Sequence, residues 1–353
     1  MTNPAALPRV AAPDVVSPGP LALPSLAVID VTGADALSFL QAQLSNDLVG
    51  AGAGHACLAG YCSPKGRLLA LPLVLALHDG SLRLIVPAEL VGGLLQRLRM
   101  YVLRADVSFV ERADLRCLGL EVEEGGVGER LAERVPGFPA TPPAEPLQVL
   151  DGERDSDVLH ACRWHDAHRP ARHARFLLVA KGELAGREDA GGEEARWRLG
   201  DISAGVPRIA LATREAFVPQ MVNLQLIGAL SFRKGCYPGQ EIVARMQYLG
   251  KLKRHMRRFR VSGEAGEVLP GTPLVTGDGE DEAGSVVDAV ATPEGIELLA
   301  VVRIAAGGEA LRLGGAELEP LALPYALPEE TPATAPAAAG DVDARGAPRE
   351  KDA

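Results

Sequence analysis

The pattern of apolar residues changes near residue 256, and this change constrains the fold more than any other feature of the sequence. Before this point, apolar runs typical of strands alternate with stretches at helical spacing, such as Ala36, Leu40 and Leu44. After it, short apolar segments are separated by glycine and proline without helical periodicity. We therefore expect an α+β architecture followed by a small C-terminal β-barrel.

The chain has 353 residues, which is longer than a domain with a single hydrophobic core usually is. We predict a first α+β domain at 25–114, a second α+β segment at 115–255 and the barrel at 256–325. The two ends, 1–24 and 326–353, are rich in proline and alanine and lack apolar periodicity, so we expect them to be disordered.

The first domain opens with a predicted strand at 26–32 and a helix after Gly33. Residues 67–86 read as a hairpin that turns at His78-Asp79-Gly80, and a helix is expected from 87 to 100. In the second segment, strands are expected near LRCLGLEV and ARFLLVA. The sheet is expected to carry its helices on one side.

Composition and cysteine usage favour a cytoplasmic protein with reduced thiols. Hydrophobic residues make up 47% of the chain, but no apolar run reaches the about 18 residues that span a bilayer. Residues 1–20 are interrupted by prolines and lack the pattern of a secretory signal. Five cysteines, an odd number, argue against a disulfide framework. We expect the protein to be a monomer that does not associate with a membrane.

Charge is unevenly distributed. The net charge is −10, which disfavours direct nucleic-acid binding. Between Arg233 and Arg260, however, nine basic residues face a single acid, Glu241. This segment is either a solvated face or a site for an anionic ligand. An RNA-binding accessory that uses residues 245–260 stays open as an alternative.

Four of the seven histidines gather with one cysteine, a composition that superficially suggests a metal site. These residues are His160, Cys162, His165, His168 and His173. Their spacing is irregular and matches a polar connection between two strands, so we predict no metal ligand there. Cys57 and Cys62 fit no zinc or redox spacing and are expected to be core thiols.

Cys236 lies in the segment FRKGCYPGQEIVARMQY, residues 232–248, which we call the signature segment. Arg233 and Lys234 precede it, and the following residues predict a turn into a short helix whose positive end faces the thiol. Both features favour the thiolate. A small apolar residue beneath a tight turn is the competing interpretation.

The signature segment resembles that of the YgfZ family of folate-binding proteins, which are relatives of the glycine-cleavage aminomethyltransferase. The matching positions are Lys234, Gly235, Cys236, Tyr237, Gly239, Gln240, Glu241 and Arg245. Further likeness lies in AFVPQMVNLQ, WRLGDISAGVP, VTGADALSFLQAQLSNDL and YCSPKGR, so the resemblance covers about residues 25 to 325.

The resemblance implies a three-domain aminomethyltransferase-like fold around a central opening. It also implies tetrahydrofolate or a derivative as cofactor, and a role in supporting iron–sulfur enzymes or their assembly proteins, tRNA-modifying enzymes included. Cys236 is then the working thiol, with Lys234 close to it in sequence, and a transient contact with an iron–sulfur cluster is also implied. The implied folate contacts are Trp197, Asp201, Ser203, Asn223, Tyr237 and Arg245.

Two departures from the family pattern bear on activity. The region KGRLLALPL is apolar where aminomethyltransferases place a catalytic carboxylate, so an enzyme of the aminomethyl-transfer type is the weaker alternative. Ser203 stands where the family often has a glutamate that pairs with the pterin ring, and Asp201 is the candidate substitute. We expect a protein that is not a conventional enzyme.

Overall fold

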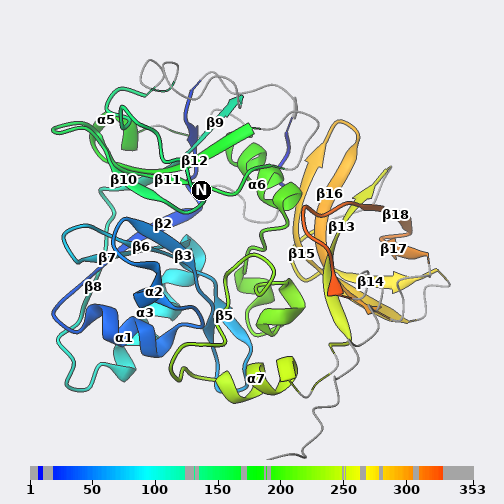
Figure 1. Cartoon of the computed structure of the whole chain (residues 1–353). Coiled ribbons are helices and arrows are strands. Elements are labelled where there is room, and N and C mark those ends of the chain that lie inside the picture. Colours follow the sequence, from blue (N-terminus) through cyan, green and yellow to red (C-terminus); the bar gives the residue numbers. More distant parts are fainter. Residues whose placement is uncertain are drawn as a thin grey trace, which may run out of the picture.

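The computed structural model describes residues 7–10, 19–123, 131, 135–167, 173–186, 188, 192–248, 250, 252–262, 268–277, 281–304 and 310–328. Within this part of the chain, the strands form two five-stranded sheets, a closed six-stranded barrel and a two-stranded ribbon. Figure 1 shows the two sheets one above the other, with the barrel beside them and helix α6 (Glu193–Ala204) between the upper sheet and the barrel. No helix in the described ranges is long and apolar enough to cross a bilayer.

Sheet 1, the lower sheet, is antiparallel and has the strand order β3-β6-β7-β2-β8. Its strands are β2 (Leu26–Thr32), β3 (His55–Leu58), β6 (Leu73–Ala76), β7 (Leu82–Pro87) and β8 (Ser108–Glu111). The accompanying helices are α1 (Ala36–Gln43), α2 (Leu48–Ala51), η1 (Ala88–Leu90) and α3 (Val91–Tyr101). The predicted strand, the helix after Gly33 and the helix after residue 87 are confirmed.

The predicted hairpin at 67–86 forms only in part. Strands β6 and β7 pair as expected, but residues 68–70 form a separate strand, β5 (Leu68–Ala70), which pairs with β4 (Tyr61–Cys62). Pro72 explains the break, because proline has no N–H to donate to a strand ladder. The β4–β5 ribbon then carries the turn that meets the signature segment.

Sheet 2 has the order β1-β9-β12-β11-β10. Its strands are β1 (Leu21–Ala22), β9 (Arg116–Glu123), β10 (Val149–Asp151), β11 (Val158–Arg163) and β12 (His173–Ala180). Every residue of β12 is buried. The reason is that one face packs into the core shared with sheet 1 and the other into a separate core around Phe138 and Phe176. A strand covered on both faces is nearly continuously apolar, as ARFLLVA is apart from Arg175.

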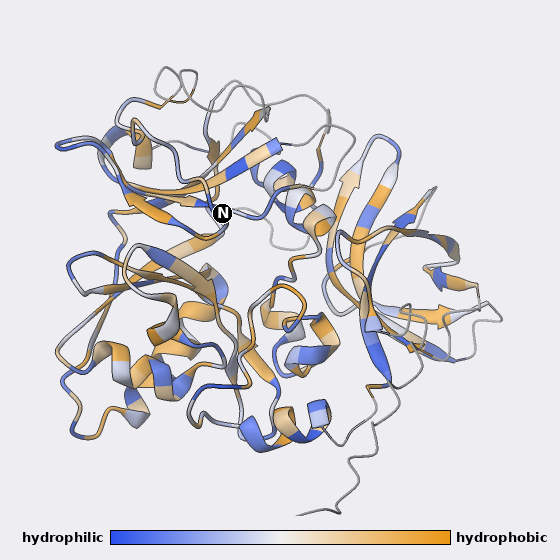
Figure 2. Cartoon of the chain, in the orientation of Figure 1, coloured by the Kyte–Doolittle hydropathy of each residue, from blue (hydrophilic) through white to orange (hydrophobic). Residues whose placement is uncertain are grey.

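The barrel has the order β13-β16-β15-β14-β17-β18. Its strands are β13 (Arg254–Val261), β14 (Pro273–Thr276), β15 (Glu282–Thr292), β16 (Gly295–Arg303), β17 (Leu311–Leu313) and β18 (Ala316–Leu321). Its interior is filled by apolar side chains such as Leu298 and Val286. Figure 2 shows hydrophobic residues concentrated along the strands of the sheets and the barrel. The predicted barrel is confirmed.

The remaining helices are α5 (Gly182–Ala185), η3 (Leu211–Thr213), η4 (Pro219–Val222) and α7 (Gln240–Tyr248). The prediction that both ends of the chain are disordered is wrong for some residues. Leu21 and Leu23, expected in a disordered segment, are each 1% exposed, because β1 completes the edge of sheet 2. Leu327 is also buried. The other residues of the predicted disordered ends lie mostly outside the described ranges, and the domain boundaries stay predictions.

Candidate functional site

The signature segment packs backbone to backbone against the β4–β5 turn. Gly239, which precedes α7, has a φ of 79°. A Cβ atom at this position would lie 2.4 Å from the carbonyl oxygen of Ser63 and 2.7 Å from Cα of Gly66. Gly66 itself has a φ of 69°. The two loops therefore meet at glycines because only glycine combines this backbone conformation with so close an approach.

Lys234 anchors the signature segment to α1. Its ammonium donates hydrogen bonds to the backbone carbonyl oxygens of Gln41 and Leu44, at the end of the helix where carbonyls lack intrahelical partners. The same nitrogen lies 5.3 Å from the ring centroid of Tyr237. Burial lowers the pKa of Lys234 to about 8, and Asp47 opposes this effect. These contacts make Lys234 a positioning residue, and its action on Cys236 stays a prediction.

Cys236 is the one exposed thiol among the five cysteines, all of which lie in the described ranges. Burial raises the pKa of the other four thiols to about 12; these are Cys57, Cys62, Cys117 and Cys162. A buried, protonated thiol is a poor nucleophile. The prediction that Cys57 and Cys62 are core thiols is confirmed.

The predicted helix after Cys236 is confirmed as α7. Gln220 holds it in place, because its Nε2 donates to the carbonyl oxygen of Val243 at 2.7 Å. Tyr237 is only 6% exposed, and burial raises the pKa of its hydroxyl. Glu241 and Arg245 remain exposed on the outer side of α7. The signature segment thus combines firm anchors with an accessible stretch around Cys236.

Trp197, one of the implied folate contacts, lies inside the protein. It is 3% exposed, and the guanidinium carbon of Arg175 lies 3.9 Å from its ring centroid. A Cβ at Gly119 would lie 2.3 Å from Cε3 of the indole ring. Glycine in β9 therefore makes room for the tryptophan, and these contacts account for Trp197 as a core residue.

Asp201 is oriented by two donors. Its Oδ1 accepts hydrogen bonds from Nε1 of Trp164 at 2.7 Å and from Nη1 of Arg175 at 2.9 Å. Burial raises the pKa of Asp201, whereas the nearby Arg175 opposes the rise. The side chain nevertheless keeps 19% of its surface exposed.

Arg175 is a residue that the sequence interpretation missed. Its side chain is fully buried, and it also donates to the carbonyl oxygen of Trp197 at 2.7 Å and lies 3.6 Å from Glu121. The available signal was a single charge inside the apolar strand HARFLLVA, because charged residues are rarely buried unless paired.

Ser203 and Asn223 are fully buried. The Ser203 hydroxyl donates to the carbonyl oxygen of Gly200, one turn earlier in α6. Asn223 adopts a φ of 60°, and its Nδ2 donates to the carbonyl oxygen of Met256 at 2.9 Å and to the hydroxyl of Tyr325 at 3.3 Å. Its Oδ1 is buried without a partner. Folate contact by Ser203 or Asn223 stays a prediction.

The histidine-rich connection shows no metal geometry in the part of it that the structure describes. No group of three or more potential ligands converges in the described ranges. His160 instead lies 3.0 Å from Asp151 on the neighbouring strand. His165 is half-buried, and loss of solvation lowers its pKa to about 4. His168 lies outside the described residues.

Three of the nine basic residues between Arg233 and Arg260 pair with acids on the barrel. Arg258 lies 2.7 Å from Glu297, and Arg260 lies 3.0 Å from the same carboxylate. Arg254 lies 3.9 Å from Glu282. Arginines that form ion pairs with carboxylates on neighbouring strands attract the phosphate backbone of a nucleic acid less strongly. This arrangement weakens the RNA-binding alternative.

No family model matches the chain. Individual proteins, however, match it over most of its length. The tRNA-modifying protein YgfZ of Yersinia pseudotuberculosis is 32% identical over 343 residues, which cover 92% of this chain and 98% of that protein. The tRNA-modifying protein YgfZ of Edwardsiella ictaluri is 32% identical and covers 76% of this chain, with 78% of its own length matched.

The chain belongs to the YgfZ family. The crystal structure of the glycine cleavage system aminomethyltransferase T from Bartonella henselae matches this YgfZ-family chain with a TM-score of 0.57 at 15% identity. The match covers 87% of this chain and 86% of that one. The match confirms the predicted aminomethyltransferase-like fold. At 15% identity it gives no information about function.

Proposed function

We propose that this YgfZ-family protein is a folate-binding accessory that supports iron–sulfur enzymes, tRNA-modifying ones among them, through Cys236. The observation that carries the proposal is the contrast between one exposed thiol and four buried ones. The exposed thiol sits on a segment fixed by Lys234 and Gly239. A thiol presented in this way can meet a macromolecular partner. We place the protein in the cytoplasm, where thiols stay reduced.

Asp201 is the residue that best fits a folate. A carboxylate can accept a charge-assisted hydrogen bond from an N–H group on the aminopyrimidine edge of a pterin. The Oδ1 atom is already occupied by Trp164 and Arg175, whereas part of the side chain stays exposed for a ligand. Trp197, Ser203 and Asn223 shape the surroundings of this acid and the start of the barrel. When bound, the folate would supply one-carbon or redox chemistry of its own.

Aminomethyl transfer is the less supported reading. The residues after the β4–β5 turn are Leu68, Leu69 and Ala70, which are all buried and carry no acid or base. General acid–base chemistry needs a titratable side chain within hydrogen-bond reach of the substrate. These three positions supply none.

Complementation tests the thiol. In a strain that lacks its own YgfZ, the Cys236→Ala variant should fail to restore the product of an iron–sulfur tRNA-modifying enzyme, measured as modified nucleoside by mass spectrometry. Gly235→Ala is the matched control, because a Cβ there has nothing within 4 Å and the thiol is kept. Full restoration by Cys236→Ala would refute the proposed role.

A folate titration tests the cofactor. We expect calorimetry to give a dissociation constant in the micromolar range or weaker for a reduced folate, and Asp201→Asn to weaken it about tenfold, the scale of one lost charge-assisted hydrogen bond. Reduced folates should also quench tryptophan emission. Because Trp164 lies 6.3 Å from Trp197, the contribution of Trp197 is the difference that Trp197→Phe makes. Absence of binding heat in the wild type would refute folate binding, whatever the thiol does.

A further inference from the structure

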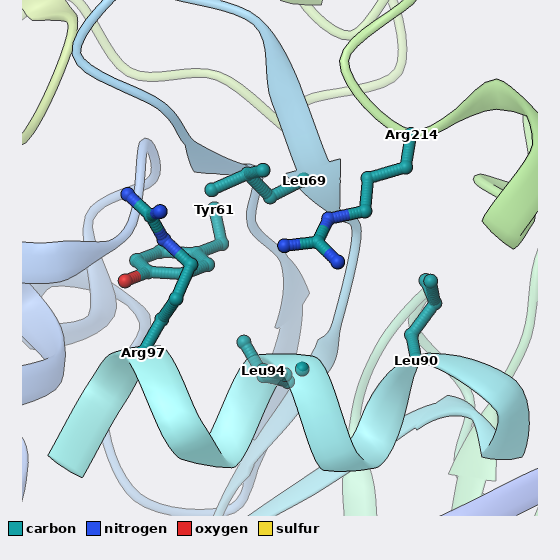
Figure 3. Close-up of a pocket in the computed structure, with 7 residues that line it drawn as sticks. Tyr61, Leu69, Leu90, Leu94, Arg97 and Arg214 are labelled. Carbon is teal, nitrogen blue, oxygen red and sulfur yellow. The ribbon is translucent and has the colours of Figure 1, made fainter.

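A small pocket lies between helix α3 and the loop that follows η3, away from the signature segment in sequence (Figure 3). Leu69 and Leu94 form apolar walls, and Arg97 and Arg214 reach the pocket from opposite elements. The enclosed space is about 10 Å³, room for about one water molecule. Tyr61 lines it and is 1% exposed.

The charges of this pocket are all of one sign. Within the described ranges, neither Arg97 nor Arg214 has an ion-pair partner. The Nε atom of Arg97 is buried and has no hydrogen-bond partner, while its guanidinium supports the buried hydroxyl of Tyr61. Burial raises the pKa of Tyr61, so this hydroxyl stays a neutral donor at physiological pH. An anion bound here would neutralise the two guanidiniums and could accept a hydrogen bond from the buried donor that lacks a partner.

Guanidinium groups match oxyanions in both geometry and charge. Each can place two parallel N–H groups on two oxygens, and two arginines on different elements approach one ion from different directions. The enclosed space admits one oxygen, and the others would lie at the mouth between the guanidiniums. A tetrahedral ion, with oxygens in four directions, suits this arrangement better than a planar carboxylate.

We propose that the pocket between Arg97 and Arg214 binds a tetrahedral oxyanion of the phosphate class. The ion takes the place of one water beside Tyr61 and bridges α3 to the loop after η3. This site is independent of the folate and thiol chemistry proposed above, because none of its residues belongs to the signature segment or to α6. The ion is either free phosphate or the phosphate group of a monoester.

Calorimetry with inorganic phosphate on the full chain, at constant ionic strength in chloride, tests the site. We expect saturable binding to the wild type and at least a tenfold loss in Arg214→Gln. Arg104→Gln is the matched control, because this exposed arginine follows α3 outside the pocket and its loss removes the same charge. Equal affinity in the wild type and Arg214→Gln, or no saturable heat in the wild type, would overturn the proposal.

A second variant keeps both arginines and blocks the space. A Cβ at Gly93 would lie 3.0 Å from Nη1 of Arg214, and leucine is a better helix former than glycine. Gly93→Leu should therefore fold and lose phosphate binding by a similar factor. Retained binding in this variant would place the ion elsewhere. Glycerol phosphate separates the two sources: tighter binding than inorganic phosphate indicates a monoester, and weaker binding indicates the free ion.

Discussion

At the residue scale, exposure decides which cysteine can react. Four thiols are buried and have pKa values raised to about 12, and Cys236 is exposed. We expect iodoacetamide at neutral pH to modify Cys236 more than about tenfold faster than any other cysteine in the native protein. Peptide mass spectrometry measures each rate, and the chain in denaturant serves as the control. Similar rates at all five cysteines before unfolding would contradict this prediction.

Lys234 provides a second prediction at this scale, in the pH dependence of stability. Burial lowers the pKa of this lysine from 10.5 to about 8 in the folded chain. Between these values the unfolded chain binds more protons than the folded one, so the contribution of Lys234 to the free energy of unfolding rises with pH. The stability of the wild type minus that of Lys234→Met should therefore increase from pH 8 toward 10.5 and be flat below about pH 7.

Denaturant unfolding at several pH values measures this difference. Taking the difference removes the opposite trend of the buried cysteines, which ionise in the unfolded chain first. A difference that falls with pH would mean that the folded chain holds the charged lysine more tightly than the unfolded chain does.

At the element scale, the contact between the signature segment and the β4–β5 turn depends on glycine. Gly239→Ala forces an alanine into a left-handed conformation and against the carbonyl oxygen of Ser63. We expect a loss of about 1–3 kcal/mol in the free energy of unfolding. Gly235→Ala, in the same segment but with open space around its Cβ, should change it by less than about 0.5 kcal/mol. Equal effects of the two substitutions on urea unfolding would argue against the glycine contact.

At the scale of the whole molecule, an ion pair ties α6 to the barrel. The guanidinium of Arg198 binds the carboxylate of Asp288 on β15, and both side chains are mostly buried. Arg198→Met leaves the carboxylate without its partner, so we expect a loss of about 3 kcal/mol. Adding Asp288→Asn should recover part of that loss, since the charge is gone. Thermal and denaturant unfolding of the three variants measure this coupling, and strictly additive losses would contradict it.

Local patterns in the sequence were enough for several features. Helical spacing at Ala36, Leu40 and Leu44, the glycine-punctuated strands after residue 256 and the apolar run of β12 each identified an element that the structure contains. The signature segment identified the family and the helix after Cys236. These signals are readable because each reflects one element and its nearest neighbours along the chain.

Tertiary structure decided what each polar side chain does. Lys234 lies two residues before Cys236 in sequence, yet its ammonium binds carbonyl oxygens at the end of α1, some 190 residues earlier. Trp197 is packed by Arg175 and Gly119, and Arg97 meets Arg214 across a pocket. Pairings between residues so far apart depend on how the layers stack, and no periodicity along the chain encodes them. The sequence determined the elements and the family, whereas only packing determined which charges are satisfied and which thiol is exposed.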